Sequence, residues 1–87
     1  MTSLTTEDFW DCYYKLPKQI QELATKKYNL WKDNTKHPSL RFKCVDAVDD
    51  IWSISINMTY RGLGAKDDNE ITWFWVGTHG EYDKILK

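Results

Sequence analysis

The chain has 87 residues, of which 41% are hydrophobic and 15% are aromatic, including five Trp and five Tyr. This composition excludes an intrinsically disordered chain, and the large flat side chains can bury enough area for a small domain to fold without disulfides. The net charge of −1 excludes a nucleic-acid binder driven by bulk positive charge, so any such binding needs cations gathered on one face. We expect a single domain over residues 1–87.

The spacing of the cysteines and the character of the N-terminal residues indicate the cellular compartment in which the protein works. Cys12 and Cys44 show neither a CxxC pattern nor metal-ligand spacing, which predicts no disulfide framework and no metal site. The opening residues have no basic start followed by an apolar run, so no signal peptide is expected. The longest apolar stretch, residues 73–77, is too short to span a membrane. We therefore expect a cytoplasmic protein with no membrane partner.

Two amphipathic helices are predicted in the first part of the chain. Thr5 and Thr6 precede the acidic start of EDFWDCYYKL, a pattern typical of a capped helix N-terminus, and no strand is expected before this helix. Pro17 ends the first helix and suits the first position of a second one, PKQIQELATKKYNLWKDN. The second helix places its apolar residues on one face, namely Ile20, Leu23, Ala24, Tyr28 and Trp31. The two segments predict a helical hairpin whose apolar face needs covering.

The hydrophobic period changes from helical to alternating after residue 39. We predict strands at residues 40–45, 51–61 and 70–77, with the GLGAKDDNE segment as a turn before the last one. Short connections favour an antiparallel meander. The predicted fold class is α+β: an N-terminal two-helix hairpin packed on one face of a small antiparallel sheet, followed by a short C-terminal tail segment.

Alternation along these strands predicts a cationic face on the sheet. If the large apolar residues of the second strand meet the helices, Arg61 lies on the opposite face among Ser, Asn and Thr side chains. By the same reasoning Arg41 and Lys43 of the first strand share that face. His79 and Tyr82 follow the third strand and are expected beside it.

Such a face has the groups needed to hold and cleave a phosphodiester. Arg61 and Arg41 offer planar donors to phosphate oxygens, and Lys43 offers a point charge. His79 can donate or accept a proton near neutral pH, and Tyr82 can stack on a base or ribose. These groups suffice for attack of a ribose 2′-hydroxyl on the adjacent phosphate without a metal or other cofactor.

Each of these residues also has a purely structural interpretation. A polar strand face with one arginine is typical of a solvated sheet face. His79 beside a glycine suits a capping role, and Tyr82 suits an apolar contact of the last segment. His37 is interpreted as a loop residue. Lys26 and Lys27 are interpreted as solvated helix residues, with a basic helix edge that binds RNA as the alternative.

The order of four segments resembles the RelE/ParE superfamily of bacterial type II toxins: LPKQIQELATKKYNLWKDN, HPSLRFK, WSISINMTYRGLG and ITWFWVGTHGEYDKIL. The resemblance extends over about residues 9–86. It implies that Arg61 occupies the place of a frequent active-site cation of the family. It implies that Arg41 and Lys43 contact RNA, and that His79 and Tyr82 match the His or Arg and the Tyr that many members carry near the end of the chain.

The resemblance also implies a partner and a target. Members are encoded with a cognate antitoxin that wraps the toxin. The RelE-like branch cleaves mRNA on the ribosome, whereas the ParE-like branch inhibits DNA gyrase without a nuclease centre. The family's usual opening strand is not expected in this chain, which leaves a sheet edge where an antitoxin segment can add.

Three functions from different classes follow. The preferred one is a ribosome-dependent, metal-independent mRNA endoribonuclease, with Arg61, His79 and Tyr82 as catalytic residues and with Arg41 and Lys43 binding RNA. The second is a gyrase inhibitor. The third is a decayed toxin that only binds its antitoxin, which is supported by the acidic balance and by Ser55 at a position where many relatives carry arginine.

Overall fold

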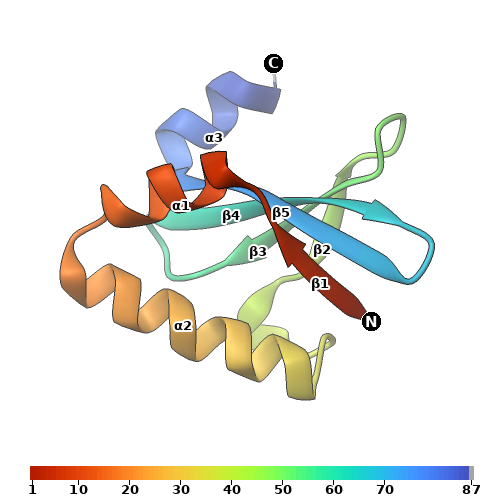
Figure 1. The fold of residues 1–87 in the computed structure, drawn as a ribbon, viewed down its shortest axis with the longest axis horizontal. Helices are drawn as coiled ribbons and strands as arrows, with labels where there is room; N and C mark the ends of the chain where they lie inside the picture. The colour runs from red at the N-terminus through yellow and green to blue at the C-terminus, as the bar shows by residue number, and fades with distance from the viewer. Residues whose placement is uncertain (87) are drawn as a thin grey trace.

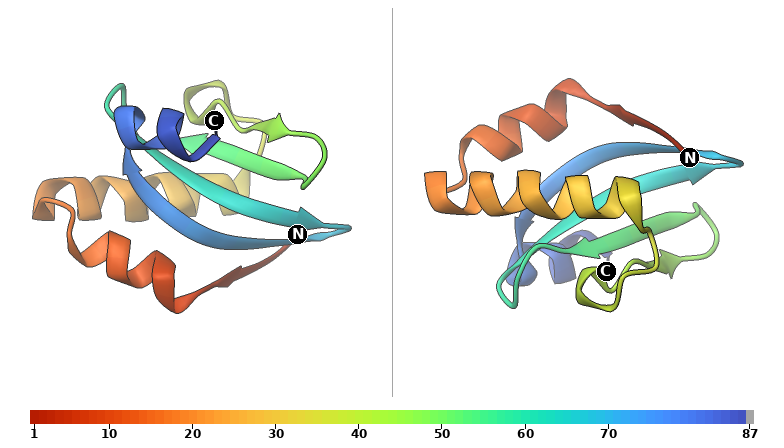
Figure 2. Two further views of the ribbon diagram at one scale, coloured as in Figure 1. Left: turned by 90° about the horizontal axis from the view of Figure 1, so that it is seen from above. Right: turned by 90° about the horizontal axis from the view of Figure 1, so that it is seen from below.

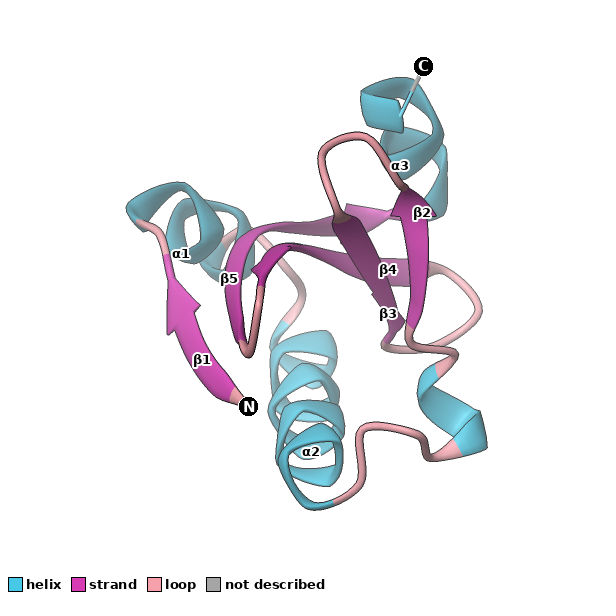
Figure 3. Cartoon of the chain, turned by 90° about the vertical axis from the view of Figure 1, so that its right-hand side faces the viewer, coloured by secondary structure: helices cyan, strands magenta, loops and turns pink. Residues whose placement is uncertain are grey.

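The computed structural model describes residues 1–86, which form a five-stranded mixed sheet with helices on both faces (Figure 1). Helix α2 lies against one face and α3 against the other, while α1 lies alongside β5 (Figure 3). In chain order the elements are β1 Thr2–Thr5, α1 Glu7–Tyr14, α2 Lys18–Asp33, the 3-10 helix η1 Pro38–Leu40, β2 Lys43–Asp46, β3 Ile51–Ser55, β4 Tyr60–Asp67, β5 Glu70–Thr78 and α3 His79–Leu86.

The predicted helical hairpin is confirmed. Thr6 caps α1, because its Oγ1 accepts a hydrogen bond of 3.1 Å from the backbone N–H of Phe9. Pro17 precedes α2, and Trp31 on the predicted inward face of α2 is 1% exposed. Within the described residues, no helix is long and apolar enough to cross a membrane.

The strand order is β1-β5-β4-β3-β2, and β1 runs parallel to β5 (Figure 2). The prediction that no strand precedes the first helix is therefore wrong, and β1 occupies the sheet edge that was expected to be open. Ser3 anchors this strand through contacts far away in the sequence: its Oγ accepts hydrogen bonds from Tyr28 Oη at 2.9 Å and from Trp73 Nε1 at 3.2 Å. A four-residue parallel strand held in this way leaves no periodic signal in its own sequence.

The predicted strand over residues 51–61 is a hairpin. It turns between β3 and β4, where Asn57 Oδ1 accepts hydrogen bonds of 2.8 Å from the backbone N–H groups of both Thr59 and Tyr60. The predicted turn over residues 62–70 instead supplies most of β4, the central strand. Gly64 fits within that strand because a Cβ there would come within 2.9 Å of Ile71 and Trp73 side-chain atoms.

The core lies between the sheet and α2. Its buried cluster consists of Trp31, Leu40, Ile54, Ile71 and Trp73. The opposite face of the sheet is not the solvated polar surface that the structural interpretation of the sequence implied. Ser53 and Ser55 are 3% and 8% exposed, because the register places apolar Leu63 and Trp75 in the same row as Ser53 and because α3 packs against β4 and β5.

The predicted tail segment is helix α3. A capping box starts it: Thr78 Oγ1 accepts a hydrogen bond of 3.3 Å from the backbone N–H of Glu81, and Glu81 Oε1 accepts hydrogen bonds from the hydroxyl and the backbone N–H of Thr78. This box fixes the direction in which the chain leaves β5, and it therefore positions His79.

Candidate phosphate-binding site

Three cations converge on a pocket of about 480 Å³ between α2, η1 and the β3–β4 turn. We call it the cation pocket. None of the residues that line it is acidic, so its formal charge is positive. The lining residues are Lys27, Pro38, Ser39, Arg41, Ser55, Ile56, Asn57, Met58 and Arg61. A concave site with three cations and several hydroxyl and amide groups suits a phosphate-bearing ligand.

Arg61 is the half-buried cation of this pocket, and the β3–β4 turn holds it in place. Its Nη1 donates hydrogen bonds to the carbonyl oxygens of Asn57 and of Tyr60, the latter at 3.0 Å. Ser55 Oγ donates to the same Asn57 carbonyl at 3.1 Å. Both bonds from the guanidinium involve Nη1, so within the described chain the donors on Nη2 and Nε remain for an anion.

Arg41 lines the cation pocket because of a backbone conformation that strand alternation does not predict. It is not on a strand, because it follows η1 in the left-handed conformation with φ of 46°. Its backbone N–H donates to the carbonyl of Pro38 at 3.3 Å, which ends the 3-10 turn and directs the chain toward β2. Arg41 and Arg61 line the same pocket, as neighbours on one surface were predicted to do. The strand predicted at residues 40–45, however, begins only at Lys43.

Lys43 lies outside the cation pocket but on the predicted face of the sheet. It is exposed on β2 opposite Ser53, and Ser53 is two residues from Ser55, the partner of Arg61 on β4. Lys43 therefore stands one row away from Arg61 on the same face of the sheet, with strand β3 between them.

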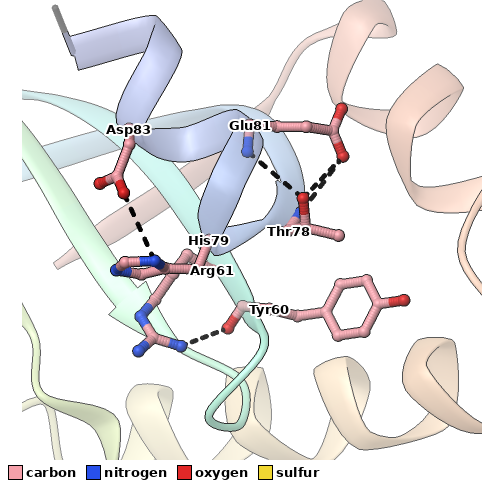
Figure 4. A network of polar contacts seen from close by, with 6 residues as sticks. All are labelled: Tyr60, Arg61, Thr78, His79, Glu81 and Asp83. Carbon is pink, nitrogen blue, oxygen red and sulfur yellow. Dashed lines mark hydrogen bonds and ion pairs between the residues drawn. The ribbon is translucent and has the colours of Figure 1, made fainter.

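His79 and Tyr82 lie together at the start of α3 (Figure 4 shows His79). Their rings stack with centroids 5.6 Å apart and planes at 18°, and His79 Nδ1 lies 3.5 Å from Asp83 Oδ2. The backbone N–H of His79 donates to the carbonyl of Thr59, two residues before Arg61. Arg61 and His79 therefore share one end of the β4–β5 pair, although neither His79 nor Tyr82 lines the cation pocket.

Several residues of the pocket were not predicted from the sequence. Ser39 was not singled out, Asn57 was placed on the same sheet face as Arg61 but given no role, and Lys27 was interpreted mainly as a solvated residue. A signal for Lys27 was present, because it lies four residues after Leu23 and four before Trp31, both of which face inward. For Ser39 no signal was available, because its position depends on the turns that bring η1 beside the β3–β4 hairpin.

The chain matches one family by sequence: the model of the ParE-like toxin domain covers residues 18–84. The chain belongs to this family. The predicted resemblance to the RelE/ParE superfamily of toxins is thereby confirmed, and the domain is a toxin of that superfamily. No curated protein matches this toxin domain by sequence.

Solved structures share the fold of this toxin domain. A YoeB/ParE toxin from Agrobacterium tumefaciens superposes with a TM-score of 0.68 at 14% identity, over 91% of this chain and 99% of that one. The RelBE2 toxin–antitoxin complex from Mycobacterium tuberculosis gives a TM-score of 0.64 at 22% identity, over 90% of each chain. YafQ from E. coli gives 0.67 at 10% identity, over 92% of this chain and 94% of that one. These likenesses confirm the predicted α+β fold class.

Proposed function

We propose that this toxin cleaves mRNA on the ribosome by attack of a ribose 2′-hydroxyl on the adjacent phosphate, and that this cleavage arrests translation. The observation that carries the proposal is the convergence of Lys27, Arg41 and Arg61 on one pocket without an acidic lining residue. Phosphate contacts from cations supply most of the affinity of proteins for nucleic acid. A chain with a net charge of −1 binds RNA only where its cations are concentrated in this way.

Arg61 is the residue proposed to stabilise the reacting phosphate. Its guanidinium is half-buried and already held by two carbonyls, so little reorganisation is required when negative charge develops on the pentacoordinate phosphorus. Arg41 and Lys27 position the same phosphodiester, and Lys43 binds the backbone one row further along the sheet. This arrangement requires no metal or other cofactor.

His79 and Tyr82 are proposed to act at the edge of the cation pocket. His79 exchanges a proton with the reacting oxygens, and its 3.5 Å contact with Asp83 is an ion pair whenever the imidazole is protonated. Tyr82 stacks on His79 and offers an aromatic face on which a splayed base can also stack. In this proposal the ribosome presents the mRNA to the toxin as an unstacked single strand.

A second candidate function is inhibition of DNA gyrase. Two observations favour it: the matching family is described as ParE-like, and His79 lies outside the lining of the cation pocket. In this alternative the basic pocket contacts the gyrase complex, and no RNA is cut. Toxicity then survives His79→Ala and is accompanied by DNA damage signalling.

The partner proposed for this toxin is a cognate antitoxin, in line with the toxin–antitoxin complex among the solved structures of this fold. An apolar pocket of about 530 Å³ between β1, α1 and α2 is the most suitable surface for it. Exposed apolar side chains surround this region, including Leu4 and Trp10, which line the pocket, and Tyr14 on α1.

Induced expression in bacteria separates the two target classes. Wild type, Arg61→Ala and His79→Ala are expressed, and incorporation of labelled methionine and thymidine is followed after induction. For a ribonuclease, methionine incorporation falls first with the wild type, and both variants lose growth arrest while remaining folded. Unchanged toxicity of both variants rules out the ribonuclease mechanism, and an early fall in thymidine incorporation favours gyrase.

A further inference from the structure

A hydrogen-bonded chain of three side chains ends in the cation pocket. Lys27 Nζ lies 3.4 Å from Ser39 Oγ, and Ser39 Oγ lies 2.9 Å from His37 Nδ1. Lys27 and Ser39 line the pocket, and His37 is half-buried. The roles proposed above leave Ser39 and His37 unused.

The direction of this chain follows from its donors and acceptors. His37 Nδ1 accepts a 3.2 Å hydrogen bond from the backbone N–H of Ser39, so this nitrogen presents its lone pair and carries no proton. The hydroxyl of Ser39 must then donate to Nδ1. Lys27 has only donors, so it donates to Ser39 Oγ. Each proton therefore points toward His37, which makes the imidazole the terminal acceptor of the chain.

Capping alone does not require a histidine at this position. His37 caps η1 through the backbone N–H two residues ahead, and the chain makes the same contact elsewhere with ordinary capping residues. Asn34, Asp46 and Asn57 each accept from the backbone N–H two residues ahead, at 3.1, 3.0 and 2.8 Å. His37 differs from these in one chemical property, which is that its acceptor atom is an imidazole nitrogen, the group that acts most often as a general base in enzymes.

We infer that Ser39 and His37 form the proton acceptor for the attacking 2′-hydroxyl, an inference that rests on the RNA cleavage proposed above. The 2′-oxygen bonds to phosphorus as its proton passes to Ser39 Oγ, and the hydroxyl proton of Ser39 passes to His37 Nδ1. The bond from phosphorus to the 5′-oxygen breaks, and that oxygen takes a proton from the imidazolium of His79. The products are a 2′,3′-cyclic phosphate and a 5′-hydroxyl, and both histidines recover their initial state by proton exchange with water.

This assignment divides the work among the three residues of the chain. Ser39 touches the reacting hydroxyl and is a catalytic residue, whereas His37 acts through Ser39. Lys27 orients Ser39 Oγ and binds the phosphate, so its removal weakens RNA binding as well as the chemical step. The two histidines then have opposite roles: His37 accepts a proton, and His79 donates one.

The test uses the full chain and ribosomes carrying mRNA, with single-turnover cleavage measured at saturating toxin. His37→Asn keeps a capping side chain but removes the proton acceptor, so we expect an unchanged thermal unfolding midpoint and a loss of cleavage rate of about 100-fold or more. Ser39→Ala gives a similar loss, and Ser39→Thr, which restores a hydroxyl, recovers most of it. Because the two residues act as one unit, the double variant His37→Asn/Ser39→Ala is no slower than Ser39→Ala.

The other outcomes overturn the inference in distinguishable ways. Cleavage by His37→Asn at the wild-type rate makes His37 a capping residue only, while the proposed ribonuclease function stands. Losses that multiply in the double variant contradict a shared proton path. An absence of cleavage by the wild type overturns both the inference and the proposed function. Lys27→Ala weakens RNA binding, and Lys36→Ala is its matched control, because Lys36 is exposed and does not line the pocket.

Discussion

Helix α2 serves two regions of the molecule that are built on different principles. Trp31 lies in the core, where its ring packs edge-on against Phe42 and Trp73 at 5.7 and 5.4 Å between centroids. Lys27, one turn earlier, lines the cation pocket. The core is fixed by close packing of large side chains, whereas the pocket is fixed by backbone turns that hold cations from three separate elements. Changes in the first region should affect folding, and changes in the second should affect function.

The largest expected effect on stability is at Trp31. Trp31→Ala removes a side chain that is 1% exposed and leaves a cavity, so we expect the free energy of unfolding to fall by about 3–5 kcal/mol. Urea unfolding followed by circular dichroism measures this loss. Trp10→Ala is the matched control, because Trp10 is 41% exposed and should cost much less. Equal losses at the two positions would contradict the placement of the core.

Arg61 gives the corresponding test of the cation pocket. We expect Arg61→Ala to reduce RNA cleavage by about 100- to 1,000-fold, because a preorganised donor to the developing charge is lost. Arg61→Lys should rescue little of this, since lysine keeps the charge but not the forked donors. Lys66→Ala is the control on the same strand, because Lys66 packs over the Trp52 ring and does not line the pocket. Full activity of Arg61→Lys would show that charge alone suffices.

Gly64 tests how closely the core side chains pack against the backbone of the central strand. A Cβ on Gly64 would lie 2.7 Å from Ile71 Cγ1 and 2.9 Å from Trp73 Cε3, so we expect Gly64→Ala to cost about 1–3 kcal/mol of unfolding free energy. Gly80→Ala is a control with nothing within 4 Å of the added carbon, and in helix α3 it should leave the protein equally or more stable. An unchanged thermal unfolding midpoint of Gly64→Ala would mean that Ile71 and Trp73 pack less tightly against β4 than these distances imply.

The smallest expected effect is at the start of α3. Thr78→Ala removes the two capping-box hydrogen bonds made by the Thr78 hydroxyl, with an expected cost of about 1 kcal/mol. Because the box positions His79, we also expect the RNA cleavage rate to fall, even under conditions in which the variant remains fully folded. Thermal unfolding and cleavage rates measured on the same preparation test this. A loss of stability with an unchanged cleavage rate would show that the start of α3 has no part in RNA cleavage.

Sequence periodicity predicted the elements whose side chains face the core. The inward stripe of α2 and strand β5 followed from apolar spacing, and both are present. β1 was missed because its anchoring depends on Ser3 meeting residues of α2 and β5. The β3–β4 turn was missed because Ile56 and Tyr60 continue the alternation of β3, although the backbone reverses between them.

The candidate site was predicted in part, for a related reason. Arg61 and Arg41 were expected to be neighbours, and they line one pocket, but the left-handed backbone at Arg41 replaces the predicted strand. The contribution of Ser39 could not be predicted, because its hydrogen bond with Lys27, 12 residues away in the sequence, is specified by the tertiary fold. Local pattern gives the residue types of the site, and turn geometry decides which of them meet.

The most direct test of the central claim is a cell-free translation reaction with purified toxin, in which mRNA 5′ ends are mapped by primer extension. Wild type is compared with Arg61→Ala and His79→Ala. The account predicts new 5′ ends at ribosome-engaged codons with the wild type and their loss in both variants. Intact mRNA with all three proteins would contradict it, and inhibition of gyrase supercoiling would then become the function to measure.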